Sequence, residues 1–293
     1  MATSVSRNIY ASEIPTQILG NQTQILGNQE ITLKPNAKHR SFPGSILSFL
    51  DTQEGVFRFG QLSERIPKFV NAVRREVGLS RWAPLDDCTR QSVAAWSWLT
   101  TVPRAITMTP GMAGDVQEAL RSCGDKSMSF QQKRYAWEKA TREVTDTAAM
   151  YAYSAANVAS LFPSLSKFGA SVVQFAETST TIHDGFSLKI NVENLANALA
   201  CDASEATPEI QETLKGTIRY NMIATAKDIV AFVSGMLGIY LLATGTALVP
   251  SIAFVTMSLA STVFAVIRKL YEDSMSFKPI SFLDHRSVTQ VTA

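Results

Sequence analysis

The residues able to do chemistry are few and lie far apart. The three histidines, His39, His183 and His285, fall in stretches that we predict to be loops or tails. None has a second histidine four residues away or a cysteine pair nearby, which is the spacing of a zinc site. Asp184 follows His183 directly, but neighbouring residues on a helix do not face one another. The sequence therefore predicts no metal site and no catalytic histidine.

The cysteines and glycines also lack the spacing of known sites. Cys88, Cys123 and Cys201 are single, widely separated and odd in number, so they indicate no disulfide framework. The segment from Gly235 to Gly238 has neither the lysine nor the preceding strand of a phosphate-binding loop, and it favours close helix contact instead. Neither G-x-S-x-G nor H-E-x-x-H occurs. We therefore predict no catalytic residues, no bound cofactor and no enzymatic activity.

Charge and aromatic content argue against a nucleic-acid partner. The chain carries 27 basic and 25 acidic residues, so it has no large excess of either sign. Tryptophans that stack on bases are accompanied by a concentrated basic stripe, which this sequence lacks. We predict that the four tryptophans are core or interfacial anchors: Trp82, Trp96, Trp98 and Trp137.

The chain is organised around a long apolar stretch near its end. No charged residue occurs from Ile229 to Ile267. A helix needs about 20 apolar residues to cross a bilayer, and this stretch is nearly twice that length. Gly245 and Pro250 interrupt it, because proline cannot continue a helix without a clash. The two pieces, Ile229–Leu248 and Pro250–Ile267, are each about membrane length. The pattern predicts a two-helix transmembrane hairpin, with Gly235 and Gly238 permitting helix contact.

Two features bear on this prediction. Serines and threonines dilute the apolar stretch, so a buried helical hairpin in a soluble core is the alternative. Lys227 and Arg268-Lys269 flank the stretch, and basic flanks favour the cytosolic side of a membrane. A two-span hairpin would therefore place both ends of the chain in one compartment.

The rest of the chain predicts an all-α protein. No segment alternates with a period of two for long enough to indicate a sheet. Thr207-Pro208-Glu209 is a strong helix start, with a hydroxyl, a proline and an acid in order. We predict four parts: a disordered polar leader (1–45), a helical region (46–206), a capped helix leading into the hairpin (207–270), and a loose polar tail (271–293).

The leader contains a perfect tandem repeat, Thr16–Gln22 followed by Thr23–Gln29. Two seven-residue copies, each with a glycine, are too few for a coiled coil, and the composition indicates disorder. The first residues lack the apolar core of a secretory signal peptide, so we expect another route to a membrane.

From Ser45 to Val77, apolar residues recur every three or four positions and predict an amphipathic helix kinked at Pro67. Its basic residues are Arg58, Arg65, Lys68, Arg74 and Arg75. A basic amphipathic helix can lie on an anionic membrane or meet a partner. Acidic residues among the basic ones favour a packed surface helix, and both interpretations stay open.

The middle of the chain predicts short elements separated by connections. Pro103 and Pro110-Gly111 indicate a turn, and Glu177–Ser187 reads as a polar connection without helical period. Thr147–Ser166 is uncharged and carries a stripe of small residues, so it is an open alternative as a third span. The predicted short helices are Gly114–Arg121, Phe130–Val144 and Asn191–Cys201.

The polar leader and the paired apolar segments Ile229–Leu248 and Pro250–Ile267 resemble the chlamydial inclusion membrane proteins. The resemblance implies a type III-secreted protein that inserts a bilobed hydrophobic domain into the membrane of the host vacuole. It further implies that both termini face the host cytosol, where the protein recruits or tethers a host partner. Here the larger region precedes the hairpin, whereas in many members of the family it follows. Self-association is left open.

The segment Phe49–Gly55, followed by Arg58, Leu62 and Phe69, is similar to the opening of the peroxisomal membrane-elongation proteins. That resemblance implies the alternative function, membrane shaping by a basic amphipathic helix, in a peroxisomal or other organelle membrane. Under either resemblance the lipid bilayer is a partner.

Overall fold

The computed structural model describes residues 22–26, 29–36, 46, 49, 52–80, 82–159, 163–204, 206–284 and 288–290. The fold is helical, as predicted. Its helices are α2 (Gln53–Glu76), α3 (Ala83–Gly124), α4 (Phe130–Ala159), α5 (Ser166–Ala200), α6 (Pro208–Thr244) and α7 (Ser251–Ser274), with a 3-10 turn, η1 (Pro163–Leu165).

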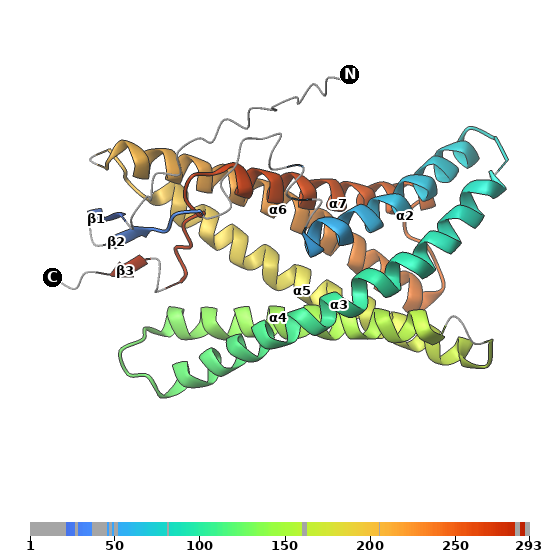
Figure 1. The fold of residues 1–293 in the computed structure, drawn as a ribbon, viewed down its shortest axis with the longest axis horizontal. Coiled ribbons are helices and arrows are strands. Elements are labelled where there is room, and N and C mark those ends of the chain that lie inside the picture. The colour runs from blue at the N-terminus through green and yellow to red at the C-terminus, as the bar shows by residue number, and fades with distance from the viewer. Residues whose placement is uncertain are drawn as a thin grey trace, which may run out of the picture.

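The helices form a closed ring. Each helix from α2 to α7 packs against the next one in the chain, and α7 packs back against α2. Figure 1 shows α6 and α7 running side by side, α4 on the opposite side and α5 between them, with α3 crossing from the end of α2 to α4. The ring encloses a shared interior, so residues far apart in the sequence meet there.

The hairpin breaks at the two positions that the sequence indicates. The helix α6 ends at Thr244, and Gly245 follows with a positive φ of 69°. Its N–H donates to the carbonyl of Leu241 at 2.8 Å, which closes the last turn. A side chain at this φ would be strained, which is why glycine suits the position. Pro250 precedes α7 with extended backbone, so the second helix starts at Ser251.

The prediction of a turn at Pro103 and Pro110-Gly111 is wrong. Both prolines lie inside α3, which continues through them without interruption. Each proline removes one backbone hydrogen bond, at a cost of about 3 kcal/mol in a helix interior. The packing of α3 between α2 and α4 outweighs this local penalty. The predicted short helix Gly114–Arg121 is the end of the same element.

The prediction of a polar connection at Glu177–Ser187 is also wrong, because these residues lie in the middle of α5. Their hydroxyl groups bond within the helix. Thr178 donates to the carbonyl of Gln174 at 2.9 Å, and Thr181 donates to the carbonyl of Glu177 at 2.8 Å. The serine and threonine hydroxyl groups can thereby be hydrogen-bonded within a helix that faces a polar interior.

A small sheet departs from the all-helical prediction. The strands β1 (Gln22–Leu26), β2 (Gln29–Leu33) and β3 (Val288–Gln290) pair antiparallel in that order. The leader is therefore not disordered at these positions. The described part of the repeat forms β1 and the first residue of β2, in a run too short to be recognised as alternating.

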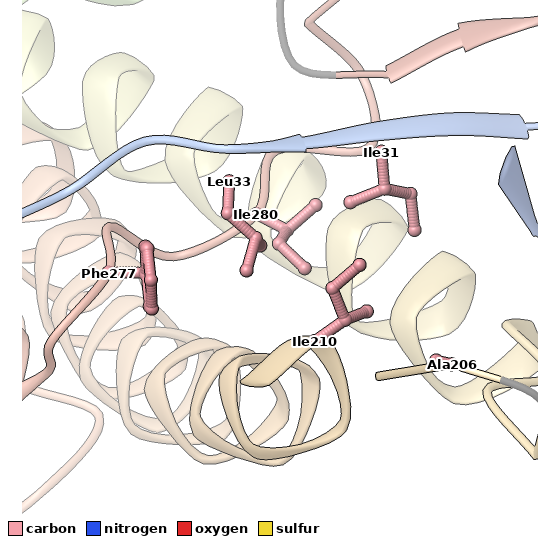
Figure 2. Close-up of a cluster of buried hydrophobic side chains, with 6 residues drawn as sticks. All are labelled: Ile31, Leu33, Ala206, Ile210, Phe277 and Ile280. Carbon is pink, nitrogen blue, oxygen red and sulfur yellow. The ribbon is translucent and has the colours of Figure 1, made fainter. Parts of the chain in front are cut away.

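The described part of the tail up to residue 284 packs against the rest of the protein, whereas the sequence predicts a loose tail. Figure 2 shows side chains from β2, the start of α6 and the tail meeting in one buried cluster: Ile31, Leu33, Ala206, Ile210, Phe277 and Ile280. The side-chain amide of Asn36 donates to the carbonyls of Glu272 and Met275, both at 2.8 Å. These contacts fasten the segment before α2 to the end of α7.

Candidate functional site

The outward face of the hairpin is apolar. Along α6, Ile229, Val233, Met236 and Tyr240 recur every three or four residues and are 40–50% exposed. Val263 and Ile267 are similarly exposed on α7. In a soluble protein these positions would face the core. Among the described residues, α6 and α7 are the two helices long and apolar enough to cross a membrane, and most of each apolar window is not buried. Exposed apolar surface of this extent marks a contact with lipid or with another protein.

Of the glycines singled out in the hairpin, Gly235 lies at a close helix contact. A Cβ placed on Gly235 would lie 2.3 Å from Oγ1 of Thr181, so this glycine lets α6 approach α5. At Gly238 a Cβ would meet the ring of Phe254 at 3.6 Å, an ordinary contact with α7. Gly245 and Pro250 form the turn already described.

The segment Thr147–Ser166 does not form one helix. Helix α4 ends at Ala159, η1 follows at Pro163–Leu165, and α5 starts at Ser166. Its small residues are used inside the protein, where Ala152 and Ala156 are buried. Helix packing, rather than membrane crossing, accounts for the stripe.

The inward side of the hairpin base carries a buried charged cluster. Lys227 Nζ lies 2.5 Å from Asp228 Oδ1 and 3.9 Å from Asp184 Oδ1. The side-chain amide of Asn191 donates to Asp228 Oδ2 at 2.6 Å. Lys227 is 7% exposed and Asp228 is fully buried. Burial raises the pKa of Asp184, and the nearby Lys227 opposes that rise. Lys227 is thus not the free basic flank that the sequence indicates, because two carboxylates neutralise it.

The charged cluster belongs to a polar interface between α5 and α6. Polar side chains line the buried faces of both helices: Ser179, Thr181, Asp184, Ser187, Asn191 and Asn194 on α5, and Thr213, Thr217, Asn221, Lys227, Asp228 and Ser234 on α6. Buried polar groups are stable only when hydrogen-bonded or paired, so this interface holds the two helices in one register.

A cavity of about 470 Å³ lies at the centre of the ring, and all six helices line it. Near the base of the hairpin its walls include Phe57 and Arg58 of α2, Arg104 of α3 and Asp146 of α4. Toward the hairpin turn the walls include Gly235 of α6 and Phe254 and Val255 of α7. The cavity therefore has a charged end and a more apolar end.

Two guanidinium groups dominate the charged end. Arg58 and Arg104 both lie over the ring of Phe57, at 5.5 and 4.5 Å from its centre. Their carboxylate partners are distant for ion pairs, with Glu54 at 3.7 Å from Arg58 and Asp146 at 3.9 Å from Arg104. Burial, with the neighbouring Arg104 cation, lowers the pKa of Arg58 to about 10, so it stays protonated at neutral pH.

The basic residues predicted on α2 are divided between two faces. Arg58 and Arg65 line the cavity, and Arg65 Nη1 donates to the carbonyl of Ser258 at 2.6 Å and to the hydroxyl of Thr262. Lys68 also borders the cavity and pairs with Glu64. Arg74 and Arg75 lie near the end of the helix, and Arg75 is exposed. The sequence shows the basic residues but not this division, because the packing of α2 against α7 decides it.

The other residues considered for chemistry have ordinary partners. His183 Nδ1 lies 3.1 Å from the carbonyl of Arg142, and Nε2 lies 3.3 Å from the Ser187 hydroxyl. The indole N–H of Trp137 donates to Cys123 Sγ at 3.3 Å. In the described part of the chain no group of three candidate metal ligands occurs. His39, His285 and the side chains of Cys88, Trp96 and Trp98 lie outside the described residues.

Comparison of the chain with family models, curated proteins and solved structures finds no match.

We predict that Asp228→Asn destabilises the protein by about 3 kcal/mol, because removing one partner of a buried ion pair leaves the other charge uncompensated. The matched control is Glu212→Gln on the exposed side of the same helix, with an expected change within about 0.5 kcal/mol. The measurement is the free energy of unfolding of the detergent-solubilised protein by circular dichroism. Equal stability of the two variants would contradict a structural role for the cluster.

Proposed function

We propose that this protein is anchored in a lipid bilayer by the hairpin of α6 and α7, with the rest of the helical ring packed against it. The observation that supports the proposal is the distribution of side chains on the hairpin, which is the reverse of that in a soluble protein. Its outward stripe is apolar and exposed, whereas its inward face carries the charged cluster. Lipid satisfies such an outward face, and charged groups in membranes face the protein interior.

The neighbouring helices support the same arrangement. On α2 the exposed face holds Phe59, Ile66, Val70 and Val77, while Arg58 and Arg65 point to the cavity. On α5 the exposed apolar residues Phe168, Phe175 and Ile182 recur at intervals of seven. An apolar outside and a polar inside are thus shared by the helices that flank the hairpin.

We propose that the ring recruits or tethers a protein partner through α4. Its exposed residues Phe130, Trp137, Val144 and Tyr151 are spaced seven apart, so they form one stripe along the helix. A stripe with this spacing suits packing against a partner helix. Helix α4 lies on the far side of α5 from α6 and α7 (Figure 1), and this stripe is exposed.

The proposed membrane is that of a pathogen-containing vacuole, reached by type III secretion, with the ring facing the host cytosol. This part rests on the resemblance to inclusion membrane proteins, carried by the polar leader and the two short spans with a tight turn.

Membrane shaping is the second candidate function. The observation that favours it is the exposed apolar face of α2, which ends in Arg74 and Arg75. A helix with an apolar face and terminal basic residues can insert at a membrane surface. In this alternative α2, rather than the ring as a whole, acts on the bilayer.

Charges placed on the outward stripe should prevent insertion. We predict that Met236→Arg with Val263→Arg abolishes carbonate-resistant membrane association, because each buried arginine costs about 2.5–3.5 kcal/mol. The control places the same charges on exposed apolar positions away from the hairpin, Leu120→Arg with Leu199→Arg, and should remain membrane-bound. Carbonate extraction followed by immunoblotting measures both. Unchanged association of the hairpin variant would refute the anchor.

A two-span anchor fixes the topology. In a variant without native cysteines, we predict that Ser127→Cys and Ser276→Cys react with an impermeant maleimide added from the cytosolic side. Thr246→Cys, in the hairpin turn, should react only after the membrane is permeabilised. All three positions are exposed in the protein itself. Labelling of Ser127→Cys and Ser276→Cys from opposite sides would exclude the two-span arrangement.

Export can be tested separately from insertion. We predict that Met1–Gln29 directs a fused reporter through a type III apparatus, because this leader is polar and low in charge. Secretion into the medium is compared between bacteria with and without a working apparatus. A leader with one copy of the seven-residue repeat deleted serves as the control and should behave like the full leader. Retention of the reporter in both strains would count against the vacuole proposal.

A further inference from the structure

The central cavity combines features that point to a ligand. Its charged end holds Arg58 and Arg104, and the Nε atoms of both are buried without a hydrogen-bond partner. Buried donors of this kind are normally satisfied, so each unpaired one requires an explanation. The carboxylates nearest to them, Glu54 and Asp146, are 3.7 and 3.9 Å away, which is beyond hydrogen-bond distance, and Arg58 Nη1 donates to the side-chain carbonyl of Gln61 at 3.0 Å.

The other cations of the cavity already have close partners. Lys227 is held between Asp228 and Asp184, and Lys68 pairs with Glu64. Of the remaining anions, Glu177 accepts a hydrogen bond from the Tyr153 hydroxyl at 2.9 Å. Arg65 donates to the carbonyl of Ser258 and to the hydroxyl of Thr262. Arg58 and Arg104 each have a carboxylate within 4 Å, but they differ from these cations in keeping a buried Nε without a hydrogen-bond partner. Paired guanidinium groups bind phosphate oxygens in a forked geometry that lysine does not provide.

The opposite end of the cavity suits a hydrocarbon chain. Ala231, Gly235, Phe254 and Val255 of the two apolar hairpin segments line it. Arg65 reaches this part of the wall from α2, and its guanidinium is bonded to the carbonyl of Ser258 and the hydroxyl of Thr262. The two ends of the cavity also lie at different positions along the hairpin. Arg58 interacts electrostatically with Arg268, at the charged base of the hairpin, whereas Phe254 lies near the hairpin turn. The charged end thus lies at the level of one headgroup layer, and the apolar end lies further across the bilayer, toward the hairpin turn.

We propose that the cavity binds an anionic amphiphile, with a phosphate headgroup held by Arg58 and Arg104 and an acyl chain extending toward Phe254 and Val255. The inference rests on the proposed membrane anchor, because the orientation of the ligand follows from the orientation of the hairpin. A membrane anchor requires only contact with bulk lipid. The cavity would in addition bind one specific class of lipid.

Binding is measured by calorimetric titration of the full chain in an uncharged maltoside detergent. The probes are dioctanoyl phosphatidic acid, inorganic phosphate and zwitterionic dioctanoyl phosphatidylcholine. We expect phosphatidic acid to bind at least about tenfold more tightly than either of the other two, because inorganic phosphate lacks the acyl chains and the phosphate of phosphatidylcholine is neutralised by its choline group. Binding of inorganic phosphate with equal affinity would overturn the proposal in favour of a free-anion site. Equal binding of phosphatidylcholine would overturn it as well.

Two matched variants locate the headgroup. Arg58→Gln with Arg104→Gln should weaken phosphatidic acid binding at least about tenfold, because charge-assisted hydrogen bonds are lost. Arg121→Gln with Arg219→Gln removes the same charge at two exposed positions outside the cavity and should leave the affinity within about twofold. Equal weakening by both pairs would show general charge attraction and overturn the site.

A third variant tests the acyl end and does not touch the arginines. Ala231→Trp fills the apolar part of the cavity, and we expect it to weaken phosphatidic acid binding while inorganic phosphate is unaffected. Unchanged affinity for phosphatidic acid would contradict the proposed chain position. Circular dichroism confirms folding of each variant. Carbonate extraction is run in parallel, so loss of lipid binding with retained membrane association refutes the ligand site and leaves the anchor standing.

Discussion

The buried charged cluster at the base of the hairpin is the constraint on which the other features depend. An isolated charge in a protein interior is too costly to persist, so Lys227, Asp228 and Asp184 must remain together. Asn191 supplies a further hydrogen bond from α5. Because these groups come from two helices, α5 and α6 can pack in only one register. That register places the apolar side of α6 outward and the polar side toward the cavity.

The resulting ring has unlike sides. Near the hairpin the surface is apolar, and ionic groups are turned inward. On the other side, α4 carries exposed or half-exposed ion pairs typical of a water-facing surface, such as Lys139 with Asp115 at 2.8 Å and Arg134 with Glu193 at 2.7 Å. An apolar side and a charged side are sufficient to orient a protein at an interface between water and lipid. It also explains why one cavity joins a charged end to an apolar end.

Local sequence signals predict the helical class, the start of α6 at Pro208 and the break between Gly245 and Pro250, because each depends on backbone preferences of the residues themselves. Signals fail where packing overrides them. Two prolines continue inside α3, and the polar centre of α5 is helical because its partners are polar too. The cavity is invisible in the sequence, since its walls come from six separate segments that only the closed ring brings together.

The ring closes through contacts between the two ends of the chain, and this has a kinetic consequence. Arg65 bonds to Thr262 across 197 positions, and Asn36 bonds to Met275 across 239. Neither contact can form on the ribosome until nearly the whole chain has been made. Loop closure over such separations is slow, because the chain loses conformational entropy before the stabilising long-range contacts have formed. The ring can therefore close only after α6 and α7 have been synthesised, so its two apolar helices are the last elements that it receives.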